Sequence, residues 1–274
     1  MNIIVTSALT SFVTSLATKG INGPVQTLDD IWELAFGGFH TYVKKKRAIR
    51  SQNLSDFKNK LANNINNIPA ENIQEPPLNI VGPALESSKY YIEEEKIRNM
   101  FAKLIASSMD NRKSDQVHPS FVEIIKQLSP LDAQILNELA LHNESSKTVP
   151  IGLLLYCKEN KTPNLGLIKG SEGFTVFKHI LNLKNIDATF DSVSVSIQNI
   201  ERLGLISVNY SSQISNDKAY DDLRNNSLIE SLKSYYTENF SKAPKYKDYE
   251  LKFTKGIIES TPFGFSFSAM CCIN

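Results

Sequence analysis

The sequence carries almost no excess of charge of either sign. Thirty lysine and arginine residues stand against 29 aspartate and glutamate residues, which gives a formal net charge of +1. A nucleic-acid-binding domain usually carries a clear basic excess, because neutralising phosphates supplies most of its non-specific affinity. The chain as a whole lacks that footprint, so we do not expect a nucleic-acid partner unless the contact is local.

Cysteine and histidine are scarce, and neither is spaced like a site. The three cysteines, Cys157 and the adjacent Cys271 and Cys272, form no CxxC pair, which favours a reduced cytoplasmic protein over a disulfide framework. GxGxxG, GxxxxGK, HExxH and GxSxG motifs are absent. We therefore predict no catalytic, cofactor-binding or metal-binding residues. An enzyme assembled from distant residues stays open, with Cys157 or Cys271 as its nucleophile. The histidines are scattered: His40, His118, His142 and His179.

Charge is absent altogether from residues 1–18, where seven hydroxyl side chains alternate with an apolar stripe. The stripe has helical spacing and predicts an amphipathic helix. It is too diluted for a transmembrane span, which needs roughly 20 predominantly apolar residues, and no basic n-region marks it as a secretory signal. We expect core or partner packing, and a membrane surface is the alternative. The stripe consists of Val5, Leu9, Phe12, Val13 and Leu16.

Helical periodicity continues as far as about residue 145. A helix capped near Thr27 is predicted to end in the basic run 44–47, interpreted as a solvated helix end, with phosphate or acidic-lipid contact as the alternative. A second helix is predicted over 54–68, where Pro69 ends it. A third is predicted over about 83–109, with a length of about 40 Å at about 1.5 Å per residue.

Three polar features of this helical region have structural interpretations. Consecutive residues on a helix point about 100° apart, so the run 93–95 of three glutamates is interpreted as a solvated face and not as a metal site. His118, at a helix start, is interpreted as a capping or packing residue. Ser129 is predicted to cap a helix in which Pro130 takes the first position and Asp132 complements the helix dipole.

Shorter apolar segments follow Val149 and change the character of the chain. A capped helix beginning at Phe190 is predicted to end at Gly204, and strands are predicted over 206–210, 249–254 and 263–269. Helices followed by a two-stranded wing resemble a winged-helix domain.

We therefore predict a mainly α fold with a small β component. The predicted domains are a helical domain over 1–116 and a winged-helix-like domain over 117–274, with strands only beyond about residue 200. In such a domain the helix before the wing reads DNA. Here its only basic residue between Ser192 and Gly204 is Arg202, so we expect the wing to bind a partner or another domain. The candidates for exposed positions are all neutral: Ser194, Ser196, Gln198 and Asn199.

Several longer segments carry a resemblance to a known family. They are 76–86, 91–110 and 117–129, joined by the later Arg-Leu-Gly-Leu and Thr-Pro-Phe-Gly-Phe segments. These segments resemble the abortive-infection alpha family of bacterial phage-resistance proteins, most strongly over 69–136. The resemblance implies antiphage defence and supplies no catalytic residues.

We predict a defence protein that binds an unidentified phage or host protein, and a homo-oligomer is compatible with this prediction. Three alternatives remain: a membrane-acting toxic effector that uses the N-terminal helix, a DNA-binding winged-helix protein, and an enzyme with a site built from distant residues. The first of these would draw on the apolar stripe of residues 1–18 and on the basic run 44–47.

Overall fold

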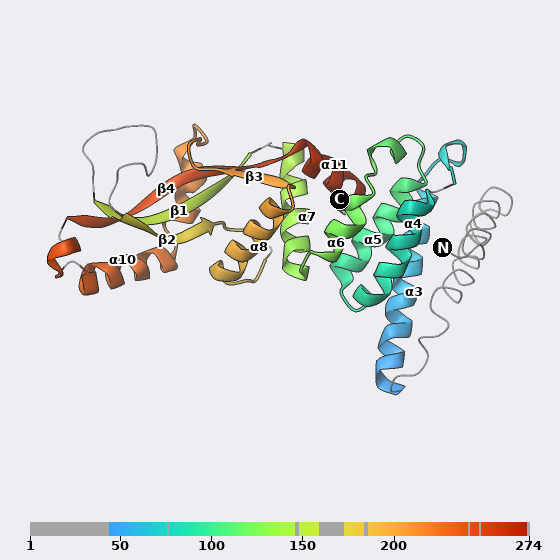
Figure 1. Ribbon diagram of the computed structural model, residues 1–274, viewed down its shortest axis with the longest axis horizontal. Helices are drawn as coiled ribbons and strands as arrows, with labels where there is room; N and C mark the ends of the chain where they lie inside the picture. Colours follow the sequence, from blue (N-terminus) through green and yellow to red (C-terminus); the bar gives the residue numbers. More distant parts are fainter. Residues whose placement is uncertain are drawn as a thin grey trace. The chain divides into compact units, whose positions relative to one another are not determined.

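The computed structural model describes residues 44–75, 77–145, 148–158, 173–183, 186–240, 242–246 and 248–272 (Figure 1). The predicted helices over 1–18 and after Thr27 lie outside these residues. The chain forms two compact units: unit 1 is Met1–Asn137 with Phe265–Asn274, and unit 2 is Glu138–Gly264. The predicted domains 1–116 and 117–274 are segments expected to fold independently. Compactness does not test independent folding, so this division stays a prediction.

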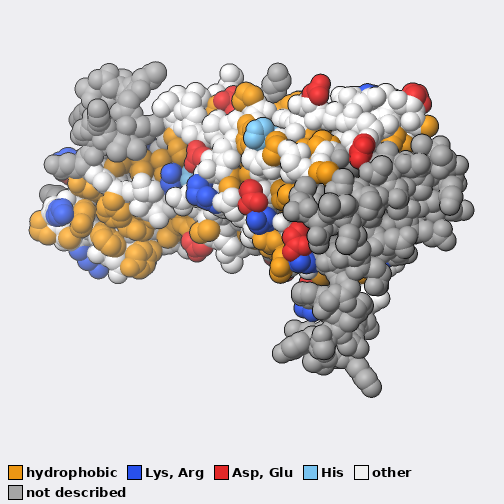
Figure 2. Space-filling model, turned by 45° about the vertical axis from the view of Figure 1, so that its right-hand side comes forward, with side chains coloured by type: hydrophobic (Ala, Val, Ile, Leu, Met, Phe, Trp, Pro, Cys, Tyr) orange, Lys and Arg blue, Asp and Glu red, His pale blue; other side chains and the backbone are white. Residues whose placement is uncertain are grey.

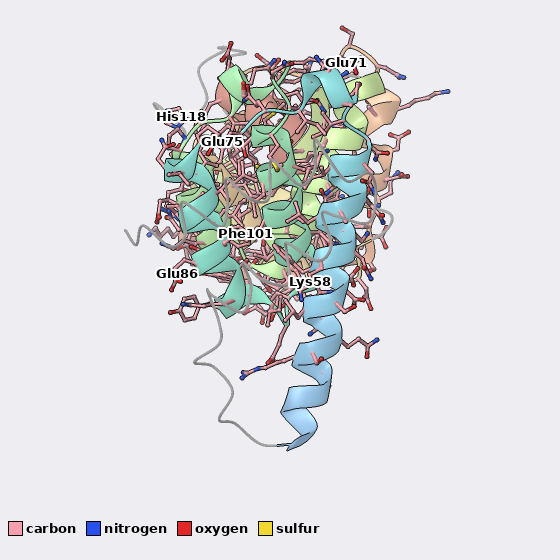
Figure 3. The ribbon with its side chains drawn as sticks, turned by 90° about the vertical axis from the view of Figure 1, so that its right-hand side faces the viewer. Lys58, Glu71, Glu75, Glu86, Phe101 and His118 are labelled. Atoms are coloured by element: carbon pink, nitrogen blue, oxygen red, sulfur yellow. The ribbon has the colours of Figure 1, made fainter. Side chains whose placement is uncertain are left out.

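Unit 1 is helical, and α5 is its central helix. α5 packs against α3, α4 and α6, and Phe101 of α5 is fully buried inside the unit (Figure 3). Apolar residues at helical spacing on α3, among them Phe57, Leu61 and Ile65, are buried as well. The helices with residues in this unit are α3 (Lys44–Asn66), η2 (Ala70–Asn72), α4 (Leu78–Ser88), η3 (Lys89–Tyr91), α5 (Glu95–Ser108), η4 (Ser114–Gln116), α6 (Ser120–Lys126), α7 (Pro130–Ser145) and α11 (Pro262–Cys271).

The single long helix predicted over 83–109 is wrong, because the chain breaks between η3 and α5. Glu94 adopts an extended conformation (φ −94°, ψ 94°) and starts α5 anew. The Ile92 carbonyl, which the break removes from the helical ladder, accepts a hydrogen bond from Arg98 Nη1 at 2.5 Å. A buried side chain thus satisfies the carbonyl that would otherwise make the break costly.

The basic run 44–47 is not a helix C-terminus as predicted, because α3 includes it and continues to Asn66. The cap predicted at α7 is confirmed. Ser129 Oγ accepts the Asp132 backbone N–H at 3.1 Å, and the Asp132 carboxylate accepts the Ser129 N–H at 2.8 Å. This reciprocal pair satisfies two backbone donors at the helix start.

The strand predicted over 263–269 is also wrong, since these residues belong to α11. Thr261 Oγ1 accepts the Gly264 backbone N–H at 2.9 Å, which makes Thr261 the cap and Pro262 the first helical residue. A Cβ on Gly264 would lie 1.7 Å from the Leu205 carbonyl oxygen, so only glycine fits there. The alternating phenylalanines were misleading because this local cap decides the structure.

α11 completes the core of unit 1 from the far end of the chain. Phe267 is fully buried and meets Phe121 of α6 edge to face, with ring centroids 5.3 Å apart. Ser107 Oγ of α5 donates to the Met270 carbonyl at 3.1 Å. Unit 1 is therefore built from two stretches that are distant in the sequence.

Unit 2 is organised around an antiparallel sheet of four strands in the order β2-β1-β4-β3. The strands are β1 (Thr148–Lys158), β2 (Gly173–Ile180), β3 (Ile206–Asn209) and β4 (Tyr249–Ser260). Two of them precede residue 200, so the prediction of strands only beyond that point is wrong. β1 is buried over nearly its whole length, and a continuous apolar run of this kind has no period that separates strand from helix.

Two predicted strands and one predicted helix of unit 2 are confirmed. The strands expected over 206–210 and 249–254 are present as β3 and β4, which pair with each other. The predicted helix is α8 (Phe190–Arg202), capped by Thr189 and ended by Gly204 at φ +74°. A winged helix is not confirmed, because β3 and β4 belong to the larger four-stranded sheet.

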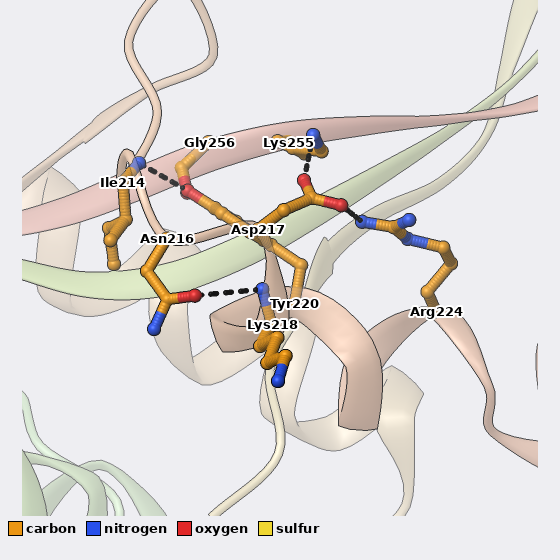
Figure 4. Close-up of polar contacts among 8 residues, drawn as sticks. All are labelled: Ile214, Asn216, Asp217, Lys218, Tyr220, Arg224, Lys255 and Gly256. Atoms are coloured by element: carbon orange, nitrogen blue, oxygen red, sulfur yellow. Dashed lines mark hydrogen bonds and ion pairs between the residues drawn. The ribbon is translucent and has the colours of Figure 1, made fainter.

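Short helices hold the connection between β3 and β4 against the sheet. Tyr220 OH donates to the Gly256 carbonyl at 3.0 Å and accepts the Ile214 N–H at 2.9 Å (Figure 4). Asp217 pairs with Lys255 and with Arg224, and these cations hold the pKa of its carboxyl below the usual range. The helices described in this connection are η5 (Asp217–Tyr220), α9 (Asp221–Arg224), α10 (Ser227–Phe240) and η6 (Pro244–Tyr246).

A bulge in β2 places a histidine in an unusual conformation. Gly152 and Leu154 pair with Ile180 and Phe177, so β2 has one residue more than β1 between these pairs. His179 lies in this bulge at φ +61° and is 1% exposed. Its Nδ1 lies 3.1 Å from Tyr210 OH, and burial lowers the pKa of His179 to about 4.

Candidate functional site

The structure gives the cysteines named as possible nucleophiles an unreactive environment. Cys157 is 8% exposed and Cys271 is fully buried. Burial raises the pKa of both thiols, most strongly that of Cys271. A nucleophilic cysteine needs a lowered pKa and access to its substrate, and neither thiol has both.

His118 and the glutamate run 93–95 have the structural surroundings that the sequence predicts for them. His118 is exposed, and its Nδ1 accepts the Ser120 N–H at 3.2 Å, which confirms a capping role at the start of α6. Residues 93–95 are all exposed, as predicted, although only Glu95 belongs to α5. In the part of the chain that the structure describes, no three His, Cys, Asp or Glu residues are grouped so that they could hold a metal ion.

Helix α8 offers DNA few groups among its side chains. Arg202 donates from Nη2 to Asn199 Oδ1 at 2.8 Å, and Ser194 Oγ donates to the Lys178 carbonyl at 2.6 Å. Ser196, predicted to be exposed, is buried, because it lies on the inward face with Ile197 and Ile200. α8 also exposes a large apolar side chain, that of Val195, at 67%.

A cluster of aromatic rings forms the most distinctive surface of unit 2. Its centre is Tyr156 of β1, which is 2% exposed. Five rings lie with centroids 4.9 to 6.0 Å from that of Tyr156. We call the whole set the aromatic cluster: Tyr156, Phe174, Tyr235, Tyr236, Phe240, Tyr246 and Tyr249.

Strand pairing and helix periodicity bring these rings together. Tyr156 is the register partner of Phe174 in β2, and Tyr249 pairs two positions further along, opposite Lys158. Tyr236 and Phe240 are four residues apart on α10, so they share a face and stack with centroids 5.0 Å apart. Aromatic pairs of this kind contribute about 0.5–1.5 kcal/mol each beyond the area that they bury.

The outer part of the cluster is open to solvent. Tyr235 is 54% exposed and Phe174 is 39% exposed, although both are large rings. Figure 2 shows hydrophobic side chains gathered at the end of unit 2 where α10 lies, with basic side chains among them. Exposed aromatic surface of this kind marks an interaction site more often than scattered single residues do.

The charges around the cluster are mixed and partly paired. Lys158 Nζ lies 3.2 Å from Asp248, and Lys245 Nζ lies 5.3 Å from the centre of the Tyr246 ring. Burial raises the pKa of Tyr156 and Tyr236, so both hydroxyls stay protonated at neutral pH. The surface therefore offers apolar ring area with neutral hydroxyl groups.

Sequence reasoning missed the aromatic cluster, because its rings come from β1, β2, α10, η6 and β4. A local signal was present: five of the rings fall between Tyr235 and Tyr249. These five rings do not recur with an amphipathic period. They therefore indicate a surface only when the positions of the strands are known.

These features define a class of protein: mainly α, with a small antiparallel sheet and an exposed aromatic surface. Residues 49–271 match the abortive infection alpha family, and the chain therefore belongs to that family. The resemblance seen in the sequence is confirmed, and membership supports a role in abortive-infection defence. Neither a curated protein nor a solved structure matches the chain. None of the described helices combines the length and the apolar composition that a membrane span requires.

Proposed function

We propose that this protein acts in antiphage defence by binding a phage or host protein through the aromatic cluster, in the cytoplasm and without chemistry of its own. The observation that carries the proposal is the exposure of Tyr235 and Phe174 beside rings that are already well packed. Rigid aromatic side chains bury large areas at little entropic cost, and they are enriched where protein interfaces concentrate their binding energy.

A protein partner suits this surface better than a nucleic acid does. Single-stranded nucleic acids bind where ring faces are free to stack on bases within a positively charged groove. Here Tyr236 and Phe240 stack on each other, and Lys158 is paired with Asp248. The mixed charges suit a partner of mixed charge, and the small net charge of the chain supplies little long-range attraction for phosphates.

The test compares phage plating on cells that express the parent protein with plating on cells that express a Tyr235→Ala/Phe174→Ala double variant. We expect the double variant to melt within a few degrees of the parent, because both side chains are exposed, and to lose protection by at least tenfold. Val195→Ala on α8 is the matched control, since it removes an exposed apolar side chain elsewhere in unit 2. Full protection by the double variant would refute the proposal.

The membrane alternative rests on the predicted helix over residues 1–18, outside the described residues. Phe12→Asp separates the two mechanisms. If the apolar face is core, the substitution destabilises the whole protein by several kcal/mol, and stability and defence fall together. If the face inserts into a membrane, melting stays unchanged while depolarisation of infected cells and leakage of liposomes are lost. We expect the first outcome, measured by melting and by membrane potential during phage challenge.

A further inference from the structure

A polar pocket of about 420 Å³ lies between α3 and the start of α5, within unit 1. One wall is a row of amides on α3, formed by Asn53, Asn59 and Asn63. The spacing of four residues places Asn59 and Asn63 on the same face of the helix, and Asn53 lies about 120° around the axis from Asn59, at the side of the pocket. The described side chains that line this pocket include no aromatic ring, which sets it apart from the ring-lined pockets that hold drug-like ligands or stacked bases.

Two buried polar atoms belong to residues that line this pocket. Arg98 is 5% exposed and Asn99 is 4% exposed, yet among the described residues neither Arg98 Nε nor Asn99 Oδ1 has a hydrogen-bond partner. A buried polar atom without a partner costs about 1–3 kcal/mol. Nε is a donor and Oδ1 is an acceptor, so a ligand that reaches both buried atoms must accept one hydrogen bond and donate another.

The charges at the pocket balance, which argues for a neutral ligand. Arg98 Nη2 lies 3.7 Å from Asp56 Oδ2 within the pocket. At the rim, Arg50 Nε donates to Glu93 Oε1 at 2.8 Å. Lys60 and Glu95, which also line the pocket, carry one charge of each sign. The lining holds three carboxylates and two cations, and Arg50 beside Glu93 supplies the third cation, so a phosphate would gain little net attraction.

We propose that this pocket binds a small neutral molecule with several hydroxyl groups, that is, a sugar or another polyol. Each hydroxyl both donates and accepts, so a polyol can satisfy the Arg98 donor, the Asn99 acceptor and the amides of α3 together without bringing a charge. Binding also replaces the cost of two unpartnered atoms with hydrogen bonds. The proposal involves only α3, α5 and the break before α5, and it does not depend on the aromatic cluster.

The test uses the full chain and ligand-observed NMR with ribose, glucose and inositol as probes. Inorganic phosphate and glutamate are the charged comparisons. We expect at least one polyol to give a saturable signal and to raise the melting temperature. An Asn59→Ala/Asn63→Ala variant, altered only at exposed positions, should fold normally and bind that polyol at least tenfold more weakly. Asn66→Ala is the matched control, because Asn66 is an exposed amide of α3 outside the pocket.

Arg98→Lys supplies a second variant, since lysine keeps the positive charge but has no equivalent of Nε. Weaker polyol binding by a folded Arg98→Lys protein would support the proposal. Three results would overturn it: no saturable polyol signal with the parent, which means that water alone satisfies the buried atoms; binding of phosphate or glutamate in place of polyols; or equal weakening by Asn66→Ala and by the Asn59→Ala/Asn63→Ala variant.

Discussion

Helices α5 and α10 each contain 14 residues, but 11 residues of α5 are buried and in α10 only Ile229 is. α5 lies inside unit 1, and its apolar side chains belong to the core. α10 lies on the sheet of unit 2 and turns large aromatic side chains partly toward solvent. The comparison separates two uses of apolar residues: in α5 they hold the fold together, and in α10 part of them remains available to a partner.

The largest expected effect tests this comparison directly. Phe101→Ala on α5 removes a fully buried ring and should lower the free energy of unfolding by about 3–5 kcal/mol. Tyr235→Ala on α10 removes a half-exposed ring with two ring neighbours and should cost about 1–2 kcal/mol. Urea denaturation followed by circular dichroism measures both variants. Similar losses would mean that α10 is as much a part of the core as α5 is.

A smaller effect is a loss of stability at low pH, which we expect in unit 2, where His179 lies. The pKa of His179 is lowered to about 4 in the folded protein, against about 6.5 in the unfolded chain. Between these values the unfolded chain binds a proton that the folded protein does not bind, so stability is present above pH 6.5 and falls as the pH drops toward 4. The loss amounts to at most about 3 kcal/mol.

His179→Asn isolates this contribution, because asparagine tolerates a positive φ and does not titrate. Hydrogen exchange of β1 and β4 amides at pH 7 and pH 4.5 should show a larger loss of protection in the parent than in the variant. Carboxylates such as Asp217, whose pKa is lowered, titrate equally in both proteins and cancel. Equal losses would assign the pH response to other groups.

The smallest expected effect is local and should be alike in the two units. Ser129→Ala removes the cap of α7, and Thr189→Ala removes the cap of α8, whose side chain accepts the Ser192 N–H. Each substitution should cost about 1 kcal/mol, seen as a small fall in melting temperature. A much larger loss at either position would show that the hydroxyl does more than cap its helix.

The features predicted correctly from the sequence are those that neighbouring residues determine. The Ser129 cap, the end of α8 at Gly204 and the pairing segments of β3 and β4 each follow from a few consecutive residues. The break at Glu94 was missed because it depends on a side-chain contact. Arg98 donates a hydrogen bond to the Ile92 carbonyl, which the break leaves without a helical partner.

The larger errors have a tertiary origin. β1 is buried on both faces, so its sequence lacks the alternation by which a half-buried strand is recognised. The aromatic cluster and the polar pocket were not predicted, since the first gathers rings from five elements and the second faces two helices toward each other. In both cases the residues become a surface only when pairing register and helix packing are known.

The place of α11 in unit 1 has a consequence for synthesis on the ribosome. Chains emerge from the N-terminus at about 5–20 residues per second, and domains generally fold as they appear. Residues 44–137 emerge first, but the side chain of Phe121 lacks its partner Phe267 until all of unit 2 has been translated. For that interval of several seconds, the nascent helical unit exposes the apolar surface that α11 later covers. It is then a natural client for a chaperone that binds unfinished hydrophobic cores.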